Sequence, residues 1–349
     1  MEPVTHFLTG ACMGRAGFNR KTAYATLAMT LAAEAPDLDM FWGLRGPVAA
    51  LEHHRGITHT LVGAPLMALL VTGVVWIWHR VRGHHKQHND PPILWGWIWF
   101  CALLADFSHI LLDWTNNYGV RPFFPFNTHW YAGSFVFIFD PILFGLLLLA
   151  LVLPELLGLA DREIGLRRPR FRGQGWAIAA LCGVLMLWSW RWAEHRVAIT
   201  TIANQPMTEE PATRIFASPH PVSPWLWDVV VETRDYYQLA QLNLRTGLIR
   251  SRAPEEIFYK QPMTPAIHAA EGSWLGRAYM DWSMMPLVDE DGSFGPASAP
   301  YTRVRFRDMR FFSTLPMLRG RHHAPLSGVV TVAPDGQIDS MELDGRQQR

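Results

Sequence analysis

The stretch of sequence that decides the fold is residues 92–113, PILWGWIWFCALLADFSHILLD. It is long and apolar enough to cross a bilayer, for which a helix needs about 20 residues. Its ionisable residues Asp106, His109 and Asp113 follow the spacing i, i+3, i+7 and therefore lie along one helix face. Ionisable side chains inside a membrane are costly and usually mark a functional site. The stretch therefore predicts a membrane-spanning helix with a polar stripe that ends at Asp113.

Other apolar segments extend this pattern along the first half of the chain. Three of them approach the same length: residues 61–79, 134–157 and 175–193. Two shorter segments, residues 4–14 and 22–35, are too short for ordinary spans. A turn signal at residues 17–20 joins these two, so we expect a short helical hairpin packed into the bundle.

The overall composition agrees with a membrane protein. The chain of 349 residues is 49% hydrophobic and 17% charged, whereas a soluble domain usually carries about 25% charged residues. The deficit of charge is concentrated in residues 1–197. The net charge of +1 gives no reason to expect a nucleic-acid partner.

The remainder of the chain has the character of a soluble domain. Strand-like runs occur there, separated by turn signals, at residues 227–233, 236–244, 302–307 and 328–332. Residues 205–224 are rich in Pro, Thr and Ser and read as a linker or an extended arm. We therefore predict an all-α polytopic membrane helix bundle over residues 1–197, followed by a small β-rich (α+β) extramembrane domain over residues 198–349.

The distribution of Lys and Arg predicts the orientation in the membrane, because loops rich in these residues stay on the cytoplasmic side. They gather at the hairpin tip and after the apolar segments that end at residues 79 and 157: Arg15, Arg20, Lys21, Arg80, Arg82, Lys86, Arg162, Arg167, Arg168, Arg170 and Arg172. We therefore expect the loops 36–60 and 113–133, and the C-terminal domain, on the outer side. A histidine-rich loop with His79, His84, His85 and His88 then lies on the cytoplasmic side, where we expect a solvated loop.

Asp and His residues with ligand character fall into four groups. They are His6; Asp37 with Asp39; His54 with His59; and Asp106 with His109 and Asp113. In the predicted topology, the helix that contains His6 descends from the outer face, and the hairpin returns to that face before Asp37. The stripe also reaches the outer face, at Asp113. All four groups are therefore predicted to meet at one side of the membrane.

Mixed His and carboxylate ligands predict a divalent metal site. Such ligands suit zinc first, with manganese or ferrous iron as alternatives, and their number allows one or two ions. The predicted ligands are His6, Asp37, Asp39, His54, His59, His109 and Asp113. Individual residues have other interpretations: His6 as a core or solvated histidine, Asp37 and Asp39 as residues that end a helix, and the stripe as a proton relay or hydrogen-bond network.

Three residues are predicted to take part in catalysis. Arg55 lies among the ligand candidates, and a guanidinium group recognises a phosphate with two parallel hydrogen bonds. A carboxylate that does not bind the metal, Asp106 or Asp140, is predicted to act as a general base. Asp140 also precedes a proline at the start of an apolar segment, so a helix cap is its alternative role.

The order of these motifs resembles that of a known family. They are Thr5-His6, Pro36-Asp37-Leu38-Asp39, His54 through His59, Asp106 through Asp113 with Asn116, Tyr118-Gly119, Arg121-Pro122-Phe123, Pro125-Phe126 and Phe139-Asp140-Pro141. Over about residues 1–160 the chain resembles the inner-membrane metal-dependent hydrolases of the YdjM type. The resemblance implies an all-helical fold in the bacterial inner membrane and a metal-dependent hydrolase activity. It implies no particular substrate.

Three functions follow as hypotheses. A hydrolase would use a metal-activated water on an ester or phosphoester of a lipid or other amphiphile, since the site is predicted at the membrane surface. A proton-coupled transporter would also place Asp and His inside the membrane, but deeper and in several spans. A metal-stabilised scaffold would leave the function to the C-terminal domain.

Overall fold

The computed structural model describes residues 1–82, 91–163, 172–205, 207–221, 223–251, 256–296, 299–312 and 324–348. They form two compact units. The first comprises Met1–Leu38 and Arg55–Ala193, and the second comprises Asp39–His54 and Glu194–Arg349. The second unit thus includes a segment from the N-terminal region, which the sequence-based division at residue 197 assigned to the membrane domain. That division itself stays a prediction.

Among the described residues, four helices are long and apolar enough to cross a membrane, as predicted. They are α5 (Gly63–Arg82), α6 (Trp95–Trp114), α7 (Pro141–Glu163) and α8 (Gln174–Asn204). With 31 residues, α8 has a length of roughly 46 Å, which exceeds the hydrocarbon core of about 30 Å. The prediction of a membrane helix bundle is confirmed.

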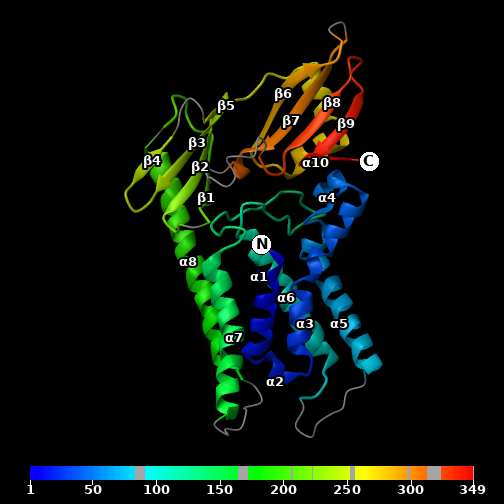
Figure 1. The fold of residues 1–349 in the computed structure, drawn as a ribbon, viewed down its shortest axis with the longest axis vertical. Coiled ribbons are helices and arrows are strands. Elements are labelled where there is room, and N and C mark those ends of the chain that lie inside the picture. Colours follow the sequence, from blue (N-terminus) through cyan, green and yellow to red (C-terminus); the bar gives the residue numbers. More distant parts are fainter. Residues whose placement is uncertain are drawn as a thin grey trace. The chain divides into compact units, whose positions relative to one another are not determined.

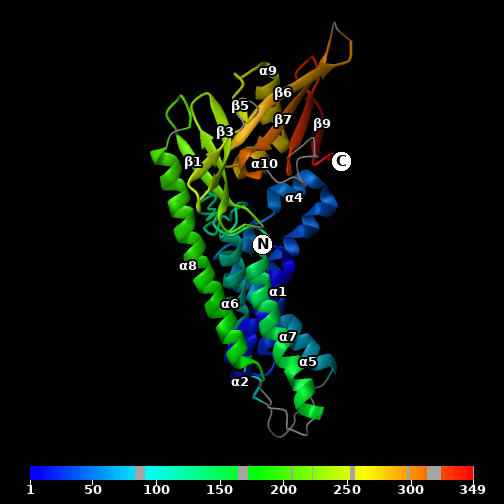
Figure 2. The same ribbon diagram turned by 60° about the vertical axis from the view of Figure 1, so that its left-hand side comes forward.

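The predicted hairpin is also present. It consists of α1 (Pro3–Met13), the π-helical turn η1 (Gly14–Phe18), α2 (Asn19–Lys21) and α3 (Ala25–Ala32). The chain reverses at Gly17, whose φ of +140° favours glycine. Helix α1 packs against α3 and α7, and both hairpin helices contact α6, as Figures 1 and 2 show. The hairpin therefore lies inside the bundle, next to the helix that carries the polar stripe.

Small residues bring these helices close together. The buried core between α3, α5 and α6 contains many alanines, among them Ala28, Ala32, Ala68, Ala102 and Ala105. Helices in membranes associate through such small residues, because no hydrophobic force favours larger ones there. This close packing fixes the end of α3 against α6.

The loop between the hairpin and α5 is ordered. It contains the 3₁₀ segments η2 (Ala35–Arg45) and η3 (Ile57–His59), with the short helix α4 (Pro47–His53) between them. The loop after α6 forms an isolated antiparallel bridge between Val120 and Tyr131. Of the predicted histidine-rich loop, His79 contacts Tyr24, and His84, His85 and His88 lie outside the described residues.

The second unit contains two antiparallel sheets (Figure 1). The first contains β1 (Arg214–Pro219), β2 (Leu226–Glu232), β3 (Tyr236–Asn243), β4 (Leu248–Arg250) and β5 (Ile257–Tyr259). The second contains β6 (Pro286–Phe294), β7 (Tyr301–Asp308), β8 (Gly328–Val332), β9 (Ile338–Leu343) and β10 (Arg346–Gln347). Helices α9 (Pro265–Glu271) and α10 (Trp274–Trp282), with the 3₁₀ turn η4 (Met309–Phe311), belong to the same unit.

The four predicted strand runs coincide with β2, β3, β7 and β8. The interpretation of residues 205–224 as a linker or arm needs a correction, because residues 214–219 pair with β2 along their whole length. Val230, Tyr237, Met285, Leu287 and Met309 form a shared core of the two sheets. The predicted β-rich domain is confirmed.

Candidate metal centre

Two histidines and two aspartates converge at one end of α6. His109 and Asp113 lie one turn apart on α6, His59 ends η3, and Asp37 lies in η2. One ligand atom from each of the four lies within 4.8 Å of the other three. His59, His109 and Asp113 are buried, and the Asp37 side chain is 21% exposed. The structure thus brings together four of the seven predicted ligands.

The spacing of these four atoms fits a small divalent cation. The Nε2 atoms of His59 and His109 are 3.0 Å apart. Asp37 Oδ1 lies 3.3 and 3.5 Å from these two nitrogens, and Asp113 Oδ2 lies 3.4 Å from each. In a tetrahedral site with bonds of about 2.0–2.2 Å, neighbouring ligand atoms are separated by roughly 3.3–3.6 Å. Four of the five distances fall within this range or meet its edges.

Hydrogen bonds orient both histidines toward the centre. His109 Nδ1 lies 2.7 Å from the carbonyl oxygen of Ala33, and His59 Nδ1 lies 3.1 Å from Thr58 Oγ1. An Nδ1 that donates to an oxygen leaves Nε2 as the lone-pair atom, and this arrangement is common for histidines that bind metals. The Ala33 carbonyl lies at the end of α3, so the hairpin directly supports a ligand.

The charge state of Asp37 suits a cation ligand. Its burial would raise the pKa, but the neighbouring imidazoles of His109 and His59 hold the pKa of this carboxyl well below its ordinary value. An ionised carboxylate is the form that binds a metal.

Arg55 fixes the fourth ligand. Its Nη2 donates to Asp113 Oδ1 at 2.7 Å, and its Nη1 donates to the carbonyl oxygen of Gly119 at 2.8 Å. The guanidinium also lies over the ring of Tyr118, and the residue is buried with a φ of +53°. These contacts turn Oδ2 of Asp113 toward the histidines. The predicted role of Arg55 in holding a substrate oxygen stays a prediction.

His6 lies beside the four-residue group. Its ring stacks on that of His109 with centroids 3.8 Å apart, and its Nε2 is 3.4 Å from Asp113 Oδ1. The side chain is fully buried, and neither ring nitrogen has a hydrogen-bond partner among the described residues. Buried polar atoms without partners are rare in proteins. His6 is thus available as a further ligand.

The other predicted ligands, Asp39 and His54, pair with each other. His54 Nδ1 lies 3.0 Å from Asp39 Oδ1, and both residues belong to the second unit. They are not members of the four-residue group.

The two aspartates predicted as general bases differ in their surroundings. Asp106 is fully buried one turn before His109, and neither carboxylate oxygen has a hydrogen-bond partner among the described residues. Asp140 accepts hydrogen bonds from the backbone N–H groups of Ile142 and Leu143 at 2.9 and 3.0 Å. These are the contacts of a helix N-cap, the alternative role considered for Asp140.

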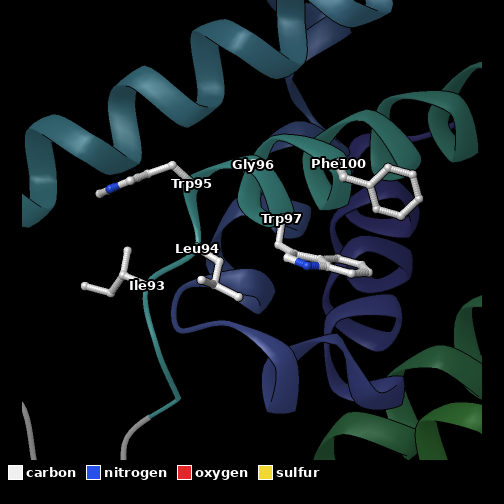
Figure 3. Close-up of a pocket in the computed structure, with 6 residues that line it drawn as sticks. All are labelled: Ile93, Leu94, Trp95, Gly96, Trp97 and Phe100. Carbon is white, nitrogen blue, oxygen red and sulfur yellow. The ribbon is translucent and has the colours of Figure 1, made fainter.

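An apolar cavity lies at the other end of α6 and is distinct from this centre. It has a volume of about 670 Å³ and is lined by Ile93, Leu94, Trp95, Gly96, Trp97 and Phe100, as Figure 3 shows. Trp95 and Asp113 are 18 residues apart, which corresponds to roughly 27 Å along a helix. None of the six residues that line the cavity has a side chain that binds metals.

The fold and the four-residue group define the class of protein: a polytopic membrane protein with a candidate metal centre in its helix bundle. The profile of the YdjM inner membrane protein family matches residues 1–198, more than half of the chain, so the chain belongs to this family. It is also 26% identical over 152 residues to "Uncharacterized protein YfhP" of Bacillus subtilis (strain 168). That match covers 41% of this chain and 43% of the relative. No solved structure matches the chain.

Proposed function

We propose that the protein is a metal-dependent hydrolase of the inner membrane, with Asp37, His59, His109 and Asp113 as the metal ligands. The observation that carries the proposal is the convergence of these four side chains at ligand-to-ligand distances that suit a small divalent cation. Two histidines and two carboxylates favour zinc, with manganese and ferrous iron as alternatives. His6 is the residue available for a second ion or a fifth ligand.

A divalent cation held by Asp37, His59, His109 and Asp113 would lower the pKa of water toward neutrality and so supply a nucleophile at physiological pH. The protein's own residues orient the ligands: Ala33 and Thr58 fix the histidine rings, and Arg55 fixes Asp113. Asp106, which no described side chain engages, is the proposed proton acceptor of this site.

The proposed substrate is an ester or phosphoester of a lipid or another amphiphile. The support for this is the position of the ligands at one end of a membrane-spanning helix, with Asp113 one residue before the end of α6. The proposed position of this end on the outer, periplasmic side is supported by the distribution of Lys and Arg. A substrate anchored in the bilayer can reach such a site without leaving the membrane.

The test is a turnover assay of the purified full-length chain in detergent with a panel of lipid esters and phosphoesters. We expect hydrolysis of at least one class, loss on chelation, and recovery on addition of zinc or manganese. The His109→Ala variant should show no turnover with any metal. A metal-loaded wild type that turns over no class of lipid ester or phosphoester in the panel would contradict the proposal.

Transport is the second candidate function, and the buried Asp106 carboxylate is the observation that favours it. A proton carrier needs such a group inside the membrane. Proton-driven flux into proteoliposomes that depends on Asp106, together with absence of hydrolysis, would favour this candidate.

A further inference from the structure

One segment of the chain connects two of the proposed metal ligands and folds with the other unit. Residues 39–54 belong to the second compact unit. Asp37 lies two residues before this segment, and His59 lies five residues after it. The backbone therefore connects the segment to both ligands through only a few residues.

The ends of the segment are tied to each other. Asp39 and His54 are its first and last residues, and they pair at 3.0 Å. Within the segment, the rings of Trp42 and His53 are 4.0 Å apart. The pair of Asp39 and His54 therefore closes the segment into a loop at its base.

The C-terminal part of the chain anchors α4, the helix of this loop. Helix α4 packs against α10 and β9. The indole Nε1 of Trp274 donates to Glu52 Oε2 at 2.8 Å, across 222 residues of sequence. This bond joins the first residue of α10 to the last turn of α4.

A second anchor satisfies the N-terminus of α4. The first N–H groups of a helix have no partner within the helix and need one from outside. Pro47 has no N–H, and the N–H of Val48 donates to Gln348 Oε1 at 3.0 Å. Gln348 Nε2 in turn donates to the carbonyl oxygen of Arg45 at 2.8 Å. Gly46, with a φ of +116°, leaves the space that this side chain occupies, because a Cβ there would meet it.

We infer that the second unit positions the metal ligands Asp37 and His59 through residues 39–54, with Glu52, Trp274 and Gln348 as positioning residues. Ligand atoms must be held within a fraction of an ångström for tight metal binding, and such precision depends on the residues that support them. The inference rests on the metal centre of the proposed function and not on hydrolysis.

The first test is zinc titration of the full-length chain, stripped of metal, in detergent. Removal of the Trp274–Glu52 hydrogen bond, by Trp274→Phe or Glu52→Ala, should weaken zinc affinity about threefold to tenfold. Glu52→Gln keeps an acceptor and should bind as the wild type does. Trp225→Phe changes a 41% exposed indole of the same unit and is the matched control, with unchanged affinity expected.

The second test uses the reciprocity of thermodynamic coupling. If a distant contact strengthens zinc binding, bound zinc must stabilise that contact by the same free energy. Addition of zinc should slow amide hydrogen exchange in residues 39–54 and in α10, and leave the sheet of β1 to β4 unchanged. Equal zinc affinity in all variants, with slower exchange only around the four ligands, would overturn the inference. A wild type that binds no zinc would contradict the metal centre itself and this inference with it, whereas intact coupling without hydrolysis would contradict only the proposed activity.

Discussion

At the scale of single residues, the contacts of Arg55 distinguish two roles for this residue in the site. A buried guanidinium that holds a carboxylate is part of the ligand support, whereas one that holds a substrate oxygen is part of the catalytic machinery. Its Nη1 and Nη2 atoms are engaged by Gly119 and Asp113. The geometry therefore favours support of the ligand.

We predict that Arg55→Lys lowers metal affinity by about tenfold to a hundredfold, as expected for a residue that orients a ligand. Lysine keeps the charge but lacks the fork that reaches Asp113 and Gly119 together. Zinc titration measures the effect, and Arg121→Lys, a buried arginine that packs on the Trp130 ring, serves as the control. Unchanged metal affinity with lost turnover would instead support the substrate-holding role.

Asp106 gives a second prediction at this scale. Asp106→Asn should retain the full metal content, because this side chain is not a member of the four-ligand group, and should lose most of the turnover if the carboxylate accepts a proton. Elemental analysis beside the turnover assay measures both. Loss of the metal in a folded variant would make Asp106 a ligand and contradict its assignment here.

The residue types, together with the spacing of His109 and Asp113 on α6, singled out the four residues that the structure brings together, since Asp and His inside a membrane need a partner. The atoms that orient them could not be predicted in this way. The carbonyl oxygens of Ala33 and Gly119 belong to the backbone, and any residue would carry them. Thr58 is adjacent to His59 in the sequence, and this adjacency was the available signal that its hydroxyl orients the histidine ring.

At the scale of elements, the hairpin is the part that supports the site from within the bundle. Gly10 of α1 faces α3 so closely that a Cβ would meet the carbonyl oxygen of Met29 and lie 2.8 Å from Ala33 Cβ. Ala33 is also the residue whose carbonyl orients His109. Displacement of α1 should therefore affect both stability and the metal site.

We predict that Gly10→Ala destabilises the protein by about 1–3 kcal/mol, the usual cost of overpacking. The same substitution at Gly73, where a Cβ would meet nothing within 4 Å, should be neutral or stabilising by about 0.5–1 kcal/mol. Thermal unfolding in detergent compares the two variants. Equal behaviour of both would contradict the close packing of α1 on α3.

Hydrophobic length and periodicity predicted the spans, the hairpin and four strands well, because burial on one or both faces sets these patterns. Strand β1 was missed, since its short run of six residues lies in a stretch rich in Pro, Thr and Ser. The true end of α8 was missed as well. The helix continues past the predicted segment 175–193 to Asn204. Charged residues end the apolar pattern near residue 193, but no Gly or Pro ends the helix there.

At the scale of the whole molecule, each of the two units is built from two separate segments of the sequence. The anchors of residues 39–54 are provided by Trp274 and Gln348, which lie more than 200 residues away. No local pattern predicts such pairings, because they depend on the completed fold of the C-terminal unit. This is the part of the architecture that sequence reasoning could not supply.

The second unit contains its own buried ion pair, which gives a prediction about acid stability. Burial would raise the pKa of Asp308, but the charge of Arg310 and hydrogen bonds from Arg310 and Ser283 hold the pKa below its ordinary value. The stability that Asp308 contributes is therefore present above its unfolded pKa of about 3.9 and is lost as the pH falls toward the folded value.

Asp308→Asn should cost about 3–5 kcal/mol at pH 7, because the buried guanidinium of Arg310 then loses the charge of Asp308. The difference from the wild type should shrink as the pH falls below about 4. Chemical unfolding followed by circular dichroism measures both, with Asp335→Asn in the exposed turn between β8 and β9 as the control. A constant difference at all pH values would contradict the ionised pair.

The central claim is that Asp37, His59, His109 and Asp113 bind a divalent metal ion. The most direct measurement is the metal content, by elemental mass spectrometry, of the purified wild type beside Asp37→Ala, His59→Ala and His109→Ala. The account predicts one or two equivalents of zinc, manganese or iron in the wild type, with loss of metal in all three folded variants. A wild type that holds no metal even after reconstitution, or folded variants that keep it in full, would contradict the account.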